Sequence, residues 1–429
     1  MNTSIASGPQ AMPDLGVVVD SGGMPGMVSS IGAEPPVNSV FSRLLHPAHA
    51  HHIPLEFTGS GSEYFRIWIV NLLLTLVTLG LYYPWAKVRK LRYFYGNTVV
   101  AGHALDFHGQ PRRMLRGTLL AGVLLVAYGQ AGEFSPIAGF VAALALSLLW
   151  PVLFRAALQF RLGHTSWRGL RFAFAGSAAD AYKALAVPLL IFLLLPSALG
   201  MLADPEGGQA DAAAAATVGL AILALLGVGL LALPYFHWRQ KKYQHDHYRV
   251  AQLQSELRVG AGTIYGIYLR TLGLVLLVPV AFCIAVALTL GGVLADKGWY
   301  SALMVALATF AWALFLFGGL YLYIVVGPYF TVRLQNLLWT KTGNRYLRFR
   351  SELALSRYLG LQLKNYLLVL ITLGLYWPWA TIASRRMRLE AVTLVSRIDL
   401  DELYMALKPR TGDAAADMGD ELLGFDIGL

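Results

Sequence analysis

The residues with the clearest potential for chemistry are short clusters of lysine and arginine that follow apolar stretches. Both side chains bind phosphate through charge-assisted hydrogen bonds, so an anion is their natural ligand. We therefore predict that the clusters contact lipid headgroups or other anions. The candidate contacts are Lys87, Arg89, Lys90, Arg92, Arg239, Lys241, Lys242, Arg385 and Arg386.

Orientation in a membrane also explains the same charges, and it is the commoner role of such residues. Short loops rich in lysine and arginine stay on the cytoplasmic side of a membrane, whether or not they bind anything. The net charge of +10 lies mostly in such loops, so it does not require a nucleic-acid partner. We predict that the basic loops at 87–92, 239–242 and 333–350 are cytoplasmic.

Signatures of catalysis are absent from the sequence. It contains no nucleotide-binding glycine loop, nucleophile elbow or HExxH phrase, which predicts a protein that is not an enzyme and has no cofactor. The run HPAHAHH at 46–52 resembles a metal-binding tract. No carboxylate or thiolate lies near it, so we predict no metal site.

Composition predicts a membrane protein. Hydrophobic residues make up 56% of the 429 residues and charged residues only 14%, which is unlike a soluble domain. Since a spanning helix needs about 20 mostly apolar residues, the sequence predicts about eight such helices. The stretches are 64–83, 115–132, 136–154, 183–202, 214–235, 267–294, 301–327 and 359–379.

One phrase occurs near both ends of the sequence. It reads TLGLYYPWAKVRK at 78–90 and TLGLYWPWATIASRR at 372–386. A glycine can end a helix that a proline then restarts, and tryptophan prefers the headgroup level, so both copies predict an interfacial elbow. Broken helices of this kind also line substrate sites in transporters. The elbow residues are Gly80, Pro84, Trp85, Gly374, Pro378 and Trp379.

Short segments with alternating polarity precede the apolar blocks. This period of two predicts half-buried strands, and the five segments enclose one, two, two, two and one apolar stretches. We therefore predict an all-α membrane fold of repeated units, with short strands on its cytoplasmic face. The strand segments are 54–57, 104–107, 169–174, 253–258 and 346–350.

The number of crossings is open between eight and six. With eight spans, both termini face away from the basic loops, which puts Arg385 and Arg386 outside against the positive-inside rule. With six spans, the first and last segments dip into the membrane or lie in its interface, and all strand segments share one side. Eight spans are the slightly favoured prediction, because Lys87 and Lys90 cannot lie at mid-bilayer.

The doubled phrase also carries a family resemblance. The segment EYFRIWIVN at 63–71, TLGLYYPWAK at 78–87 and Phe107-His-Gly109 together resemble the YjgN-like family of bacterial inner-membrane proteins. The resemblance covers roughly 53–400 and implies a multi-pass inner-membrane protein of a family without an established biochemical function, so it supplies no catalytic residues to carry over. The last copy departs from the first at Thr381, which stands where the first copy has Lys87.

These patterns together predict three regions and a non-enzymatic function. Residues 1–52 are predicted to be a disordered tail, 53–400 the repeated membrane domain and 401–429 an acidic tail. The predicted function is transport or handling of a lipid or small molecule. The alternative is a scaffold that recruits other proteins. Membrane lipids are the expected partners, with a second copy of the chain or another membrane protein as further candidates.

Overall fold

The computed structural model describes residues 50–203, 212–250, 252–293, 299–313 and 318–407. The chain divides into two units, 1–43 and 44–429, and every described residue belongs to the second. Most of the two predicted tails lies outside the described residues. A strand begins at His51 and a helix covers Leu400–Leu407, so ordered elements start two residues inside one predicted tail and extend into the other.

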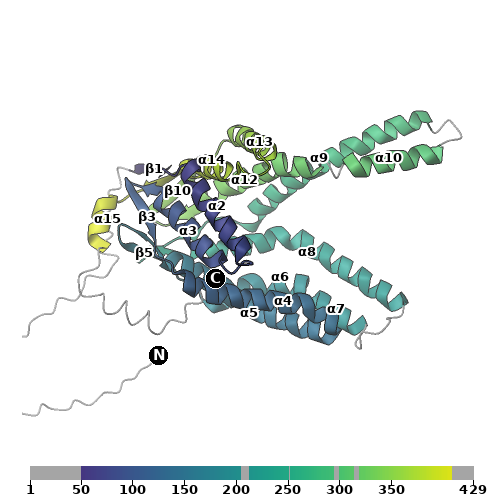
Figure 1. Ribbon diagram of the computed structural model, residues 1–429, viewed down its shortest axis with the longest axis horizontal. Coiled ribbons are helices and arrows are strands. Elements are labelled where there is room, and N and C mark those ends of the chain that lie inside the picture. Colours follow the sequence, from purple (N-terminus) through teal and green to yellow (C-terminus); the bar gives the residue numbers. More distant parts are fainter. Residues whose placement is uncertain (1–49, 204–211, 251, 294–298, 314–317, 408–429) are drawn as a thin grey trace, which may run out of the picture. The chain divides into compact units, whose positions relative to one another are not determined.

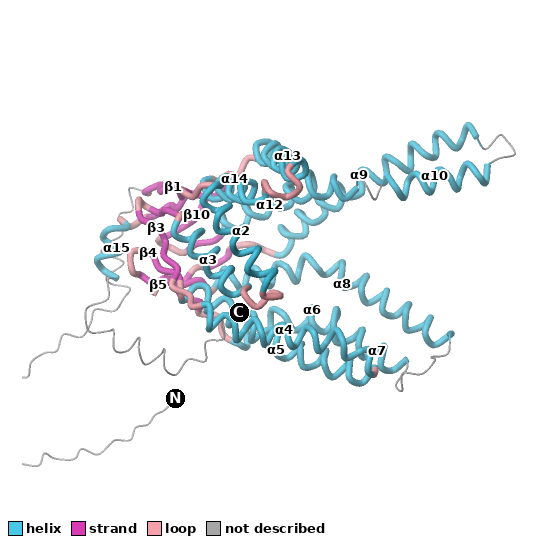
Figure 2. Tube along the Cα trace, viewed as in Figure 1, coloured by secondary structure: helices cyan, strands magenta, loops and turns pink. Residues whose placement is uncertain are grey.

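A single antiparallel sheet organises the fold (Figures 1 and 2). Its order is β7-β6-β5-β4-β3-β2-β1-β11-β10-β9-β8, and only Ser255 separates β7 from β8 in the chain. The two ends of the order are therefore joined through the chain, and β11, the last strand in the sequence, pairs with β1, the first. The eleven strands among the described residues are β1 His51–Phe57, β2 Thr98–Val100, β3 His103–Phe107, β4 Thr165–Trp167, β5 Leu170–Phe174, β6 Tyr248–Val250, β7 Leu253–Gln254, β8 Glu256–Leu257, β9 Thr342–Gly343, β10 Leu347–Ser351 and β11 Val392–Ser396.

The predicted all-α class is wrong because of this sheet. All five predicted strand segments contain strands, the fourth as the pair β7 and β8. Each of β2, β4, β6, β9 and β11 follows a basic helix and was not predicted. The first four of these have only two or three residues, which is too short for alternation to be read. Three of these short strands, β2, β4 and β9, begin with a threonine that could have indicated them. The hydroxyls of Thr98, Thr165 and Thr342 each donate to the backbone carbonyl four residues earlier.

Five helical excursions leave the sheet and return to a neighbouring strand. Because the two strands at the base of each excursion are antiparallel partners, both ends of every excursion lie at the same rim. Tight turns join strands at the other rim, with positive φ at Ala101, Gly102, Arg168 and Gly169. The excursions are α2 Gly61–Val77 with α3 Tyr83–Gly96; α4 Pro111–Phe134 with α5 Pro136–Gly163; α6 Ala178–Leu189, η1 Leu190–Leu194 and α7 Leu195–Ala203 with α8 Ala212–Asp246; α9 Ala261–Val293 and α10 Trp299–Ala313 with α11 Gly319–Tyr321, η3 Leu322–Val326 and α12 Gly327–Lys341; and α13 Leu355–Ile371 with α14 Trp377–Glu390. Helix α15, Leu400–Leu407, follows β11.

The prediction of eight spans is also wrong. Among the described residues, five helices are long and apolar enough to cross a membrane: Pro111–Phe134, Pro136–Gly163, Ala178–Met201, Ala215–Asp246 and Ala261–Ala281. The predicted stretch 301–327 lies partly outside the described residues. The first and last predicted spans fail for a clear reason. Each contains a chain reversal, which hydropathy cannot detect because it measures apolar length and not direction.

The reversal makes each of these segments a helical hairpin. Helix α3 packs back along α2, and the Asn71 side-chain amide donates to the Ala86 carbonyl across the pair at 3.4 Å. In the last excursion Asn365 donates to the Ala380 carbonyl at the same distance. We call residues 61–96 the first hairpin and residues 355–390 the last hairpin.

The two hairpins pack against each other although they lie at opposite ends of the described chain. Strand β1 pairs with β11 in the register His51↔Ser396. Above the sheet, Trp379 of the last hairpin stacks on Phe65 of the first at 5.0 Å between ring centroids. Gly61 lies under the same indole, where a Cβ atom would be 2.2 Å from Trp379 Cδ1. The contact therefore requires glycine at this position.

Candidate functional site

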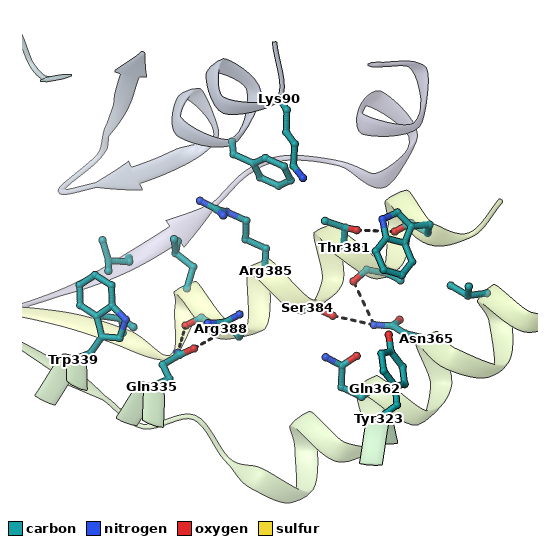
Figure 3. Close-up of a pocket in the computed structure, with 17 residues that line it drawn as sticks. Lys90, Tyr323, Gln335, Trp339, Gln362, Asn365, Thr381, Ser384, Arg385 and Arg388 are labelled. Atoms are coloured by element: carbon teal, nitrogen blue, oxygen red, sulfur yellow. Dashed lines mark hydrogen bonds between the residues drawn. The ribbon is translucent and has the colours of Figure 1, made fainter. Parts of the chain in front are cut away.

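The best-formed pocket of the described residues lies between the last hairpin, helix α12 and the first hairpin (Figure 3). Its volume is about 500 Å³, which is within the usual range of ligand sites. None of its lining residues is acidic. They are Leu55, Lys90, Phe94, Tyr323, Gln335, Trp339, Gln362, Asn365, Val369, Trp377, Ala380, Thr381, Ser384, Arg385, Arg388, Leu389 and Val392.

Three cations give the pocket its charge. Figure 3 shows Lys90 of α3 and Arg385 of α14 extending toward each other. Both flank the Phe94 ring, with Arg385 Cζ at 4.6 Å and Lys90 Nζ at 6.0 Å from its centroid. Arg388 Nε donates to Gln335 Oε1 at 2.7 Å, and Gln335 Nε2 donates to the Arg388 carbonyl at 2.8 Å. This reciprocal pair fixes the Arg388 guanidinium without neutralising it.

The electrostatics of these cations is unfavourable without an anion. Partial burial lowers the pKa of Lys90, and repulsion from Arg385 lowers it further. Burial also lowers the pKa of Arg385, to which Arg388 and Arg161 add repulsion. Both side chains still reach solvent. A bound anion would relieve the repulsion, which is the usual condition for an anion site.

Uncharged polar groups lie beside the cations. Asn365 is only 4% exposed, and its Nδ2 donates to Ser384 Oγ at 3.2 Å, while its Oδ1 has no hydrogen-bond partner. Gln362 Nε2 donates to Tyr358 Oη at 2.8 Å. Apolar residues Val369 and Trp377 complete this side of the pocket. The site therefore offers cations, hydrogen-bonding groups and an apolar wall to one ligand.

Of the other predicted cations, those on α8 and α14 have structural partners, and those on α3 lie outside the pocket. Those with structural partners are Arg239, which donates to the Lys183 carbonyl at 2.8 Å; Arg386, which donates to the Gly59 carbonyl at 2.8 Å; and Lys242, which pairs with Asp246 at 2.9 Å. Lys241 donates to Gln244 Oε1 at 3.1 Å. Lys87, Arg89 and Arg92 lie on α3 outside the pocket. Burial lowers the pKa of Lys87, with added repulsion from Arg161, and Arg92 lines a separate hollow with Asp106 and His108.

The predicted elbow residues form matching turns in the two hairpins. Gly80 and Gly374 have φ of +92° and +94°, and each is preceded by a leucine at φ of about +50°. Pro84 and Pro378 are buried in the first turn of α3 and α14. Trp85 stacks on Tyr82 and Trp379 on Tyr376. The headgroup-level position of the two indoles stays a prediction.

Comparison with known proteins assigns the chain to a family. A family model described as a bacterial protein of unknown function, DUF898, matches residues 52–420. The chain belongs to this family. Inner membrane protein YjgN of Salmonella typhimurium is 27% identical over 348 residues, which cover 77% of this chain and 86% of that protein. Inner membrane protein YjgN of Escherichia coli O157:H7 is 30% identical over 189 residues, which cover 42% and 45%. No solved structure matches.

The predicted family resemblance is confirmed. The similarity to inner membrane proteins and the five apolar helices among the described residues support a location in the bacterial inner membrane. Within this DUF898 chain, sequence reasoning found Lys90 and Arg385 but missed the polar residues that complete the pocket. Gln335, Gln362 and Ser384 are common residue types on three different helices. Only Ser384 left a signal in the sequence: in the repeated phrase it occupies the position that Lys90 occupies in the first copy.

Proposed function

We propose that the protein is a multi-pass inner-membrane protein that binds the anionic headgroup of a membrane lipid in the pocket beside the last hairpin. The single observation that carries the proposal is the group of three cations, Lys90, Arg385 and Arg388, in a pocket without an acidic lining residue. In this proposal, binding of the headgroup is the first step of lipid handling, and the lipid is then transported or presented to a partner.

The sheet supports a multi-pass arrangement with six crossings. All five excursions begin and end at one rim, so the sheet and the basic helix ends belong on one side of the membrane. The excursions α4 with α5, α6–α7 with α8, and α9–α10 with α12 each leave and return. In this arrangement Arg385 and Arg386 lie on the same side as the other basic segments, because both ends of the last hairpin lie at one rim of the sheet. By the positive-inside rule, we expect the sheet to be cytoplasmic.

Phosphate fits the pocket chemistry best. A guanidinium offers parallel N–H groups that match two phosphate oxygens, and Arg388 is already oriented by Gln335. The Lys90 ammonium reaches the same space from the opposite side. Trp377 provides an apolar surface beside the charges.

The test compares two double variants with the same loss of charge. Lys90→Gln with Arg385→Gln removes two pocket cations. The control, Arg89→Gln with Arg350→Gln, removes two exposed cations outside the pocket. At about 1 kcal/mol per charge, the pocket variant should bind phosphatidylglycerol about thirtyfold more weakly, and the control should change little. Native mass spectrometry of the purified protein with defined lipids measures this.

Two further ligands make the test specific. Phosphatidylethanolamine should lose less affinity than phosphatidylglycerol in the pocket variant, because its ammonium group offsets the charge of its phosphate. Glycerol phosphate without acyl chains should compete only weakly if the apolar wall contributes to binding. Equal loss of phosphatidylglycerol in the pocket and control variants would contradict the proposal and leave the charges a role in orientation alone.

A further inference from the structure

The tips of the two hairpins are the most exposed apolar features of the described chain. Leu79 is 94% exposed and Leu373 is 92% exposed. Both adopt φ of about +50°, a conformation that costs a leucine free energy and that glycine or asparagine would adopt more readily. In water, a leucine at this position would combine backbone strain with an exposed apolar side chain, and both are unfavourable. Its presence at both tips indicates an apolar environment there.

Every backbone N–H of the two turns is satisfied within its own hairpin. Exposed turns in water usually leave such groups to the solvent, whereas a segment in hydrocarbon must satisfy all of them internally. The threonine side chains complete the set, since Thr78 Oγ1 accepts from the Tyr82 N–H and Thr372 Oγ1 from the Tyr376 N–H, both at 3.0 Å. The other backbone N–H groups donate to backbone carbonyls of the same hairpin. They belong to Thr78, Leu79, Gly80, Leu81 and Tyr83 in the first turn and to Thr372, Leu373, Gly374, Leu375 and Trp377 in the last.

Charge and hydrogen bonding set the depth of the tips. The Asn71–Ala86 and Asn365–Ala380 bonds mark the same level on the two hairpins, and residues 71–86 and 365–380 between them contain no charged residue. Lys87 and Lys364 lie immediately outside these segments. From Asn71 to Val77 the helix rises about 9 Å, and the turn adds a few more. This length matches one leaflet of a hydrocarbon core about 30 Å thick, and not the whole core.

We infer that residues 71–86 and 365–380 are paired re-entrant hairpins, which insert into the acyl chains of one leaflet and return to the side of the sheet. The acyl chains of the lipid surround these hairpins, and the inference does not depend on the pocket. Strand pairing carries the return, because β1 with β2 and β10 with β11 bring both ends of each hairpin to one rim. The Phe65–Trp379 stack holds the two hairpins together at their bases.

Spin labels at matched positions test the insertion. In a Cys283→Ser background, the tip variants Leu79→Cys and Leu373→Cys are compared with Ser62→Cys and Ser356→Cys, which are exposed and occupy equivalent positions near the hairpin bases. Each full-length protein is reconstituted into liposomes of phosphatidylethanolamine and phosphatidylglycerol. Tip labels should collide more often with oxygen and at least several-fold less often with a water-soluble nickel chelate than base labels do. Equal nickel collision at tips and bases would overturn the inference.

Two further measurements separate re-entry from spanning and remove dependence on the labels. An impermeant maleimide that reaches a tip cysteine from the side opposite Ser62→Cys would mean that the segment spans, which also overturns the inference. In the unlabelled protein, amides 78–83 and 372–377 should exchange hydrogen several-fold more slowly in liposomes than the exposed β-turn at Ala101 and Gly102 does. Exchange as fast as at that turn would place the tips in water.

Discussion

The first and last hairpins have the same backbone but different chemistry on one face. Both have the asparagine bridge, the strained leucine, the glycine and the proline. They differ where they meet: Leu91 and Phe94 of α3 occupy the positions that Arg385 and Arg388 occupy on α14. One copy thus supplies an aromatic wall and the other the cations that lie against it. The duplication provides the scaffold, and divergence at a few positions creates the pocket.

The largest expected effect breaks the contact between the copies. Gly61→Ala should destabilise the protein by about 3 kcal/mol, because the new Cβ overlaps the Trp379 indole that is stacked between Phe65 and Tyr376. Gly360→Ala on α13 is the control, since its Cβ meets nothing within 4 Å and alanine favours the helix. Thermal unfolding in detergent should show opposite shifts for the two variants. A neutral Gly61→Ala would mean that the hairpins do not pack as described.

The next effect removes the divergence itself. Arg385→Leu with Arg388→Phe gives the last hairpin the residues of the first, and should weaken phosphatidylglycerol binding by about 2 kcal/mol through loss of two charges. Binding should also depend less on salt, because fewer ion contacts remain. Titration at several salt concentrations checks both. If the salt dependence is unchanged, anions bind elsewhere in the protein.

A smaller effect concerns the common feature, the leucine at each tip. Leu79→Asn relieves backbone strain but places an amide among acyl chains, so in liposomes it should destabilise the protein by about 1 kcal/mol or more. Ala101→Asn is the matched control, because Ala101 has nearly the same φ at the opposite, aqueous rim. Asparagine there should be neutral or stabilising. A stabilising Leu79→Asn would indicate a tip in water.

The smallest effect is the part of the pH dependence of stability that comes from Lys90, where the copies meet. Because the pKa of Lys90 is lowered by burial and by Arg385, the unfolded chain binds more protons between that value and the usual lysine value, so stability rises with pH there. Solvent screening limits this to less than about 1 kcal/mol. In Arg385→Leu the pKa should move back up and the rise should flatten. Thermal unfolding across the alkaline range measures the slope, and an identical slope in both proteins would contradict the coupling.

The sequence predicted the repeated parts of the fold and missed what connects them. The spacing of Gly80 and Pro84 and its copy at Gly374 and Pro378 was sufficient to predict two breaks. The five strand segments were readable because they alternate over four or more residues. Strands such as β4 and β9 carry two or three residues, and their existence depends on partners distant in sequence. Propensity cannot detect such strands.

The site was predictable only in part for a related reason. Lysine and arginine after an apolar stretch are conspicuous, so Lys90 and Arg385 were identified. The same reasoning grouped them with Arg239 and Arg386, which hold backbone carbonyls of neighbouring elements. Which cation faces the pocket depends on helix rotation within the assembled sheet. Gln335 orients Arg388 from another excursion, and no local pattern connects the two residues.

Because β1 pairs with β11, the sheet cannot be completed until nearly the whole membrane domain has been synthesised. At about 5–20 residues per second, the first hairpin waits on the order of tens of seconds before the strand that completes its sheet leaves the ribosome. During that time one edge of β1 and the surface over Gly61 lack their partner, and an open strand edge invites mispairing. The last hairpin then supplies the guanidiniums of the pocket, and β11, which follows it, supplies the missing strand. Chains that stop early therefore have no anion site, so a truncated protein cannot compete for the ligand of the complete one.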